Sequence, residues 1–478
     1  MRRDVLLTIF AFGLYGASKL AFNLVAVHRL DPAVVGEINA LLALHTVLLV
    51  FTVQPIASVV NRYVPEHLAS DDQGRASWLL VSGLILTLAI SSALAGVVFF
   101  GHLSSDGSRG LLRSDLLPAS IPYLWAYALY FYFKMAYYGY RRIGSYCVAE
   151  LAGSLVFLAS LGIAALSRRP QAFIFPWLAQ PMVFSGFAVW QFRREFIGLR
   201  GGSLSRAWRS AYLRYGIYWL TAAASGFGAY HLSILAATLL QPNAASVGYY
   251  AVSLSVLSPL SLLPTSISMV LFPRMTQNDA WGEAPKNATL IRESTAALAL
   301  PLAITAVIFC GFAPEILALI NIPVTVESML IFQLLTLGVS VSLLSTPAGS
   351  FLSATAYAGT ASAIGVSTLA LGLILWAALI PMLGVVGTAV GYAIMMVARG
   401  IANMVISDRH GTWWTWSPRR SIPLVGIVLL STAPAHSHWP VGGRVTLIGA
   451  LLAVMSLLML PELSRLRMVM LATLARER

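Results

Sequence analysis

The feature that most constrains this chain is a series of apolar runs, each about 20 residues long, that recur from one end to the other. About 20 helical residues cross the hydrocarbon core of a bilayer, which is roughly 30 Å thick. Backbone polar groups in lipid must be hydrogen-bonded within the protein, and continuous runs of this length lack the alternation of barrel strands. The sequence therefore predicts an all-α polytopic membrane protein. We expect about fourteen transmembrane helices, at residues 5–27, 34–60, 77–100, 117–138, 146–166, 171–190, 215–240, 249–272, 294–320, 329–353, 361–380, 384–406, 422–434 and 445–460.

The basic residues indicate the orientation of these helices. The net charge is +13, which in a soluble chain would suggest nucleic-acid binding, but here the basic residues gather in the short gaps between apolar runs. If the N-terminus is cytoplasmic, 24 Lys and Arg residues lie on the inner side and 6 on the outer side, with Lys19 inside the membrane. This asymmetry follows the positive-inside rule. We therefore expect cytoplasmic N and C termini, no nucleic-acid partner and no extramembrane domain.

Two parts of the chain share a pattern of prolines and glycines, offset by about 210 residues. An even number of helices separates the two copies, so a duplication would give parallel repeats related by an axis along the membrane normal. Prolines commonly mark helix ends, so chance matches are the alternative explanation. The matched pairs are Leu30 and Leu240, Pro32 and Pro242, Gly36 and Gly248, Pro55 and Pro264, and Pro65 and Pro273.

The repeat leads to a domain prediction. We expect an N-terminal six-helix lobe at 1–200, a C-terminal six-helix lobe at 201–410, and two additional helices with a basic cytoplasmic tail at 411–478. Two similar halves around a central cavity suit alternating access, in which the cavity opens to each side of the membrane in turn. This architecture is typical of a transporter.

Three segments resemble a known family. Residues 55–66, which end in NRYVPE, residues 247–274 with their prolines, and the small-residue segment 384–389 are similar to polysaccharide-type flippases. These proteins belong to the multidrug, oligosaccharidyl-lipid and polysaccharide exporter superfamily, and the resemblance covers the whole chain in helix number and motif order. The fourteen-helix count fits this branch, whereas the drug-exporting relatives usually have twelve.

The resemblance implies a flippase of the bacterial cytoplasmic (inner) membrane. Its cargo would be an undecaprenyl-diphosphate-linked oligosaccharide, moved to the outer leaflet for exopolysaccharide, capsule or O-antigen synthesis. The expected partners are this lipid-linked substrate, membrane lipids, and a polysaccharide polymerase with its chain-length machinery. No cofactor is expected, although a proton or sodium gradient would supply the driving force.

Ionisable residues inside the membrane are candidate functional residues because a charge there costs at least a few kcal/mol. Lys19 lies well inside the first predicted helix, where its ammonium group would meet a diphosphate, although it could also extend outward to the headgroups. His231 lies at a similar depth in the seventh helix. However, the repeat places Lys19 opposite Ala229, so strict register would point His231 away from the face of Lys19.

Further basic residues are candidates for substrate binding at the inner side. Lys134, Arg141 and Arg142 lie with three tyrosines at the inner end of the fourth helix, and such a rim suits anionic headgroups and sugars. Arg62 and Arg274 end equivalent helices in the two halves. The positive-inside rule and an interfacial aromatic belt explain the same residues without a substrate.

Three residues are candidates for ion coupling. Glu37, His45 and Glu150 lie within predicted helices and could carry a proton or bind sodium. A structural alternative for Glu150 is an ion pair with Arg141 or Arg142, which precede it on the same segment.

Two other functions compete with the flippase. A multidrug or small-cation antiporter of the same superfamily would need carboxylates in its cavity, whereas the deepest charge here is Lys19. A polytopic polysaccharide polymerase or ligase would need catalytic carboxylates, His or Arg in an outer loop. The outer gaps contain few acidic residues, and no nucleophile triad or phosphate-binding glycine loop is present. The sequence therefore favours a transporter over an enzyme.

Overall fold

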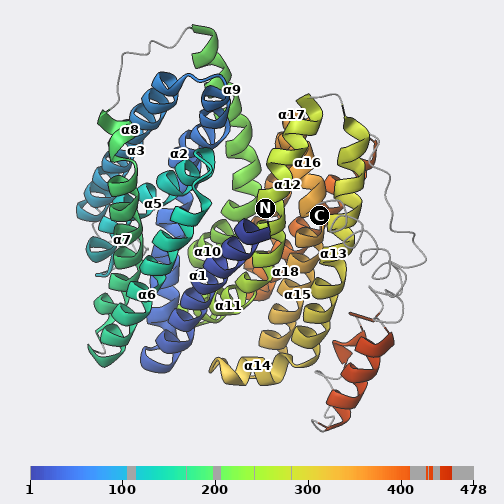
Figure 1. The fold of residues 1–478 in the computed structure, drawn as a ribbon. Coiled ribbons are helices and arrows are strands. Elements are labelled where there is room, and N and C mark those ends of the chain that lie inside the picture. The colour runs from blue at the N-terminus through green and yellow to red at the C-terminus, as the bar shows by residue number, and fades with distance from the viewer. Residues whose placement is uncertain are drawn as a thin grey trace. The chain divides into compact units, whose positions relative to one another are not determined.

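The computed structural model describes residues 2–104, 115–167, 169–197, 206–241, 243–280, 283–409, 427–428, 430–433 and 442–454. These residues form helices joined by short turns, with no strand among them (Figure 1). The α-helices are α1 (Arg2–Arg29), α2 (Pro32–Ala69), α3 (Gln73–Leu103), α4 (Leu117–Ser120), α5 (Pro122–Gly139), α6 (Ile143–Ser167), α7 (Phe175–Gln191), α8 (Arg193–Ile197), α9 (Arg206–Ala223), α10 (Ala229–Leu240), α11 (Ala244–Val256), α12 (Leu262–Ala280), α13 (Ala284–Gly311), α14 (Ala313–Leu319), α15 (Val326–Leu344), α16 (Thr346–Ala354), α17 (Ala358–Leu383) and α18 (Val385–Arg409). Three short non-α helices are η2 (Pro170–Ile174), η3 (Ala224–Gly228) and η4 (Ser258–Ser261), and a further helix spans Gly442–Val454.

The predicted all-α polytopic fold is confirmed. Each of the first twelve predicted helices coincides with one helix or with consecutive helices. Among the described residues, eight helices are long and apolar enough to cross a membrane, or nine if the bent pair Arg209–Gly226 and Ala229–Leu240 is one span. Most of the thirteenth predicted helix, 422–434, and the tail from residue 455 onward lie outside the described residues.

Several predicted spans are interrupted, and proline or glycine lies at each break. In the run predicted as 294–320 the long helix ends at Gly311, and the separate helix α14 carries Pro314 in its first turn. The run 329–353 breaks at Ser345 before Pro347. The run 215–240 bends by 58° next to η3, a π-helical turn with the sequence ASGFG. Proline lacks the N–H group that continues a helix, and π-turns loosen the regular ladder of hydrogen bonds.

Tight turns join α2 to α3 and α5 to α6. Asp72 caps α3 by accepting a hydrogen bond from the backbone N–H of Arg75 at 3.0 Å, and Asp31 caps α2 in the same way through Ala33 at 2.8 Å. Asp71 and Arg141 have φ angles of 57° and 52° in the turns after α2 and α5. These left-handed residues reverse the chain within about three residues, so neighbouring helices pack as antiparallel pairs.

The chain divides into two compact units. The first contains residues 1–255 with 365–369, and the second contains 256–364 with 370–478. The first unit therefore includes α9, α10 and α11, which the repeat assigns to the second lobe. The cause is α2, which has 38 residues and packs along α9, η3 and α10. The two units reflect how the helices pack, whereas the lobes 1–200, 201–410 and 411–478 reflect a duplication in the sequence. The lobes therefore stay a prediction.

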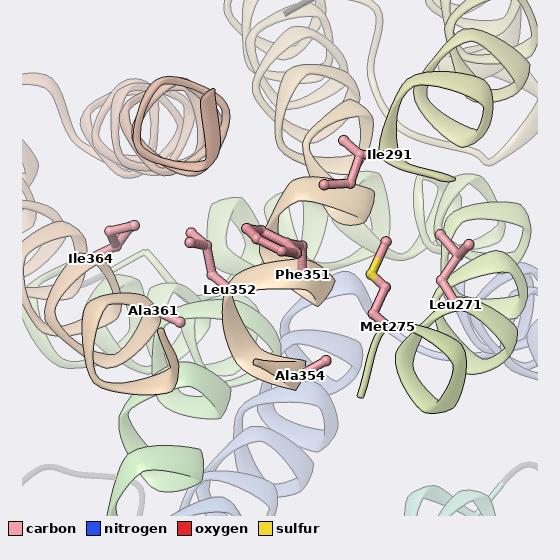
Figure 2. Packing of buried hydrophobic residues seen from close by; sticks show 8 residues of the cluster. All are labelled: Leu271, Met275, Ile291, Phe351, Leu352, Ala354, Ala361 and Ile364. Carbon is pink, nitrogen blue, oxygen red and sulfur yellow. The ribbon is translucent and has the colours of Figure 1, made fainter. Parts of the chain in front are cut away.

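The interiors of the two units differ in chemistry. In the first unit the largest fully buried side chains are aromatic and include Tyr123, Tyr130, Tyr146 and Phe157. In the second unit, aliphatic clusters dominate. One cluster joins α12, α13, α16 and α17 through Leu271, Met275, Ile291, Phe351, Leu352, Ala354, Ala361 and Ile364 (Figure 2). Glu150, a fully buried carboxylate, belongs to the first unit.

Within the first unit, the beginning of α11 lies directly against the beginning of α2. A Cβ atom added at Gly248 would lie 2.5 Å from the carbonyl oxygen of Pro32 and 3.2 Å from the backbone N of Gly36. Only glycine permits such an approach, because the obstructing atoms belong to the backbone and cannot rotate away. Gly36 and Gly248 are also the glycines that the repeat matches to each other.

We expect Gly248→Ala to destabilise the protein by about 1–3 kcal/mol, as overpacking against backbone commonly does. The matched control is Gly162→Ala in α6, where an added Cβ would meet nothing within 4 Å. That change should leave stability equal or slightly higher, because alanine favours helix more than glycine does. Thermal unfolding of the detergent-purified variants measures both effects, and equal melting midpoints would contradict the close contact.

Candidate functional site

Lys19 lies in an aromatic environment within the first unit. It is on α1, is half-buried, and its Nζ atom lies 4.2 Å from the ring centroid of Tyr15 and 5.3 Å from that of Trp177. Tyr15 precedes Lys19 by one helical turn, and Trp177 is on α7. An ammonium group over an aromatic face is stabilised by the electrons of the ring, most strongly where water is excluded. The two rings therefore hold the positive charge of Lys19 inside the bundle.

A second lysine reaches the same tyrosine ring. The Nζ atom of Lys134, on α5, lies 5.8 Å from the centroid of Tyr15, 5.6 Å from Tyr130 and 6.0 Å from Tyr146. Two ammonium groups thus converge on Tyr15. Lys134 was predicted to form one rim with Arg141 and Arg142, but its ammonium group lies in the aromatic cluster with Lys19.

Glu150 provides one negative charge for this cluster. Its carboxylate is fully buried on α6 and accepts hydrogen bonds from the Tyr130 hydroxyl, at 3.0 and 3.2 Å, and from Nε2 of Gln180, at 3.1 Å. Both Lys134 and Lys19 lie within electrostatic range of it. We name the set Lys19, Lys134, Glu150, Tyr15 and Tyr130 the lysine–tyrosine cluster. It combines two cationic groups with one anionic group.

Three helix packings bring the lysine–tyrosine cluster together. Helix α1 packs on α6, and α7 packs on both α5 and α6, as Figure 1 shows for α1, α6 and α7. The α5 residues Tyr123, Tyr127 and Tyr130 follow each other at helical spacing and stack with centroid separations of 4.7 and 5.5 Å. The hydroxyl of Tyr15 lies 3.3 Å from that of Tyr127, which ties α1 to this stack.

Sequence reasoning did not identify Tyr15, Tyr130, Trp177 or Gln180. The tyrosine stripe at positions 123, 127 and 130 was a detectable signal, because this spacing places all three rings on one face of a helix. A single Gln inside an apolar run, such as Gln180, was a second signal. The Nε1 atom of Trp177 is buried without a hydrogen-bond partner among the described residues, so it adds an unused donor beside Lys19.

His231 lies in the first unit with Lys19. It is half-buried on α10, its ring centroid lies 4.7 Å from that of Tyr230, and it is within electrostatic range of Lys19. A role of His231 in substrate binding stays a prediction.

The ion-coupling candidates lie in different surroundings. His45 on α2 is fully buried, neither ring nitrogen has a hydrogen-bond partner among the described residues, and its ring lies 6.0 Å from Tyr123. Because Tyr123 begins the stack that reaches Tyr130, His45 and Glu150 lie at opposite ends of one row of tyrosines. Glu37 is half-buried near the beginning of α2.

The contacts of Arg142 connect it to the end of α7 and to α8. It pairs with Glu195 of α8, donates a hydrogen bond to the carbonyl oxygen of Gln191 at 3.1 Å, and lies 4.9 Å from the Phe192 ring. The alternative in which Arg142 pairs with Glu150 is therefore wrong. The tight turn after α5 directs Arg142 toward the end of α7, while Glu150 points to Tyr130 and Gln180. Arg141, the left-handed residue of that turn, is exposed.

The other two basic candidates lie on separate helices. Arg62 on α2 stacks over the ring of Tyr215 on α9, with its Cζ atom 4.5 Å from the centroid. Nearby, the ring of His67 hydrogen-bonds the hydroxyl of Tyr212 at 2.6 Å. Arg274 belongs to the second unit and is exposed on α12. Substrate contact by Arg62, Arg141, Arg142 or Arg274 stays a prediction.

Comparison with solved structures places this arrangement in a known fold. The chain is similar to the lipid II flippase MurJ in an inward closed conformation, with a TM-score of 0.67, 10% identity, and coverage of 95% of this chain and 98% of that one. The chain has the fold of MOP-superfamily transporters. It is also similar to an inward-facing multidrug resistance MATE family transporter of that superfamily, with a TM-score of 0.60, 14% identity, and coverage of 84% and 96%.

A third similar structure is a MOP superfamily transporter from Pyrococcus furiosus, described as having a binding pocket of reversed polarity. It has a TM-score of 0.61, 16% identity, and coverage of 85% of this chain and 94% of that one. No protein-family profile matches the sequence, and no curated protein matches it. The resemblance to the superfamily that the sequence motifs indicated is therefore confirmed at the level of the fold.

We expect Tyr130→Phe to destabilise the first unit by about 1–3 kcal/mol, because it removes a donor to a buried carboxylate. The matched control is Tyr137→Phe on the same helix, whose buried hydroxyl has no hydrogen-bond partner among the described residues. The control should be nearly neutral. Combining each change with Glu150→Gln in a double-mutant cycle, followed by unfolding in detergent, measures the coupling. Equal effects of the two tyrosine changes would contradict the Tyr130–Glu150 contact.

Proposed function

We propose that this protein is an alternating-access flippase that moves an undecaprenyl-diphosphate-linked oligosaccharide across the bacterial inner membrane. It would supply repeat units for exopolysaccharide, capsule or O-antigen synthesis. Its termini would be cytoplasmic, and its partners would include a polysaccharide polymerase with its chain-length machinery. The observation that carries the proposal is the lysine–tyrosine cluster, in which Lys19 and Lys134 share one aromatic ring beside a single carboxylate.

The charge of the cluster favours an anionic cargo. With both lysines protonated and Glu150 ionised, the cluster carries one excess positive charge in the interior of an apolar bundle. A diphosphate supplies the missing negative charge and accepts charge-assisted hydrogen bonds from ammonium groups. The unpartnered Nε1 donor of Trp177 lies beside Lys19 and offers a further hydrogen bond to such a group.

The fold supports the same proposal. The similar MurJ structure is a flippase of lipid II, and its likeness to this chain extends over 95% of the residues. A flippase fold with a cationic interior suits a lipid-linked sugar diphosphate. We propose transport without a chemical step, because the cluster contains a buried, hydrogen-bonded carboxylate instead of a paired acid and base.

The rival function is export of drugs or small cations. The similarity to a multidrug resistance MATE family transporter suggests this rival. Aromatic rings also bind organic cations. In this chain, however, Lys19 and Lys134 already lie over those rings and would repel such a cargo. Uptake of organic cations by inverted vesicles, without movement of lipid-linked sugar, would favour this rival.

We expect Lys19→Gln and Lys134→Gln to weaken binding of the lipid-linked diphosphate by roughly 10- to 150-fold each. This range corresponds to a loss of about 1.5–3 kcal/mol for a hydrogen bond to a charged group. Arg75→Gln removes the same charge from an exposed surface pair with Asp72 and should change neither binding nor translocation. Translocation in proteoliposomes and surface polymer in a deletion strain are the readouts, with protein level as a control. Normal translocation by both lysine variants would refute the proposed site.

We further propose that Glu150 couples transport to a proton or sodium gradient, with His45 and Glu37 as further candidates along the pathway. An ion bound at Glu150 would neutralise its carboxylate and leave the lysines to the cargo. Glu150→Gln is therefore expected to make transport insensitive to either gradient while anion binding is retained or strengthened. Proteoliposomes with imposed proton or sodium gradients measure this. Loss of anion binding in Glu150→Gln would contradict the coupling role and indicate a structural one.

A further inference from the structure

The second unit contains a pocket that lies outside the lysine–tyrosine cluster. Its volume is about 420 Å³, and it lies between the end of α12 and the beginning of α13. Its lining residues are Arg274, Asn278, Lys286, Thr289 and Leu290. The charge asymmetry of the sequence predicts that this end of the helices faces the cytoplasm, at the depth of the lipid headgroups.

The walls of the pocket are held by hydrogen bonds of side-chain amides. Nδ2 of Asn278 donates to Oδ1 of Asn287 at 2.9 Å, and Nδ2 of Asn287 donates to the carbonyl oxygen of Met275 at 3.2 Å. The Asn287 side chain is fully buried. These two bonds connect the beginning of α13 to the end of α12, so they fix the separation between the two walls.

An apolar cluster supports the same two helices. Met275 and Leu271 from α12 and Ile291 from α13 pack with Phe351 and Leu352 of α16, as Figure 2 shows. Leu290, which lines the pocket, packs against this cluster. One wall of the pocket is therefore apolar and anchored in the core of the unit, while the remaining lining is polar or cationic.

The polar lining consists mainly of hydrogen-bond donors. Arg274 presents a guanidinium group, Lys286 an ammonium group, and Thr289 a hydroxyl group that can donate or accept. Arg274 is on one wall and Lys286 is on the other. The Lys286 ammonium lies 2.5 Å from a carboxylate oxygen of Glu283, while its side chain is 64% exposed. A long exposed side chain can rotate from that carboxylate to a bound anion.

We propose that this pocket binds a phosphate group, presented either by an anionic phospholipid headgroup or by a free phosphate compound. A guanidinium and an ammonium group on opposing walls match the charge and the acceptor oxygens of a phosphate. Leu290 provides a contact for the apolar part of a lipid. Glu283 competes with the phosphate for Lys286, so it weakens binding in the native chain.

The test uses the full-length protein in detergent micelles or nanodiscs, with phosphatidylglycerol, phosphatidylcholine and inorganic diphosphate as probes. R274Q and K286Q should each weaken phosphate binding at least tenfold, whereas E283Q should tighten it. The matched control is R292Q, because Arg292 is exposed on the same helix but does not line the pocket. Native mass spectrometry measures the bound lipid, and calorimetry measures the diphosphate.

A lipid headgroup site is supported if the native protein retains phosphatidylglycerol, R274Q and K286Q lose it, and diphosphate does not compete with it. Competition by diphosphate at micromolar concentration supports a site for free phosphate compounds. Equal losses in R292Q would show that general surface charge explains binding and would overturn the proposal, as would unchanged binding in R274Q and K286Q. Weaker binding in E283Q would also overturn it. Unaltered melting midpoints show that the variants are folded.

Discussion

Three charged side chains, the half-buried Lys19 and Lys134 and the fully buried Glu150, are gathered in the interior of the first unit. Two ammonium groups and one carboxylate lie among helices whose other surfaces face lipid or pack together, and each charge needs a partner within the protein. The tyrosines meet this need in two ways. Their ring faces contact the ammonium groups of the lysines, and the hydroxyl of Tyr130 donates a hydrogen bond to Glu150. The aromatic core of this unit therefore provides partners for the charges that lie within it.

The positions of the helices could be predicted from the sequence because lipid permits few alternatives. A run of about 20 apolar residues in lipid must form its backbone hydrogen bonds within itself, so it becomes a helix. Hydropathy is therefore enough to locate it. Breaks within a span were not predicted. Pro314 and Pro347 lie in the first turns of new helices, whereas Pro55 and Pro65 lie inside the single helix α2. The difference depends on whether neighbouring helices compensate the lost backbone hydrogen bond, which is a tertiary property.

The candidate site could be predicted only in part. Lys19 was identifiable because an intramembrane charge is costly, and its neighbour Tyr15 was identifiable in principle from its spacing of one helical turn. The convergence of Lys134 on the same ring depends on how α5 and α1 are rotated about their axes, and hydropathy does not set this rotation. The partners of Glu150 show the same limit. Arg142 was the nearest opposite charge in the sequence, but the turn at Arg141 directs it toward Glu195, away from the buried carboxylate.

The contact between α2 and α11 bears on how the fold arose. Residues related by a two-fold axis can touch each other only where they lie close to that axis, as in isologous interfaces. Gly36 and Gly248 are matched by the repeat, and a Cβ atom added at Gly248 would lie only 3.2 Å from the backbone N of Gly36. Chance matching of prolines at helix ends does not require this proximity, whereas duplication followed by pairing of equivalent helices does. The repeat and the packing therefore support the same explanation.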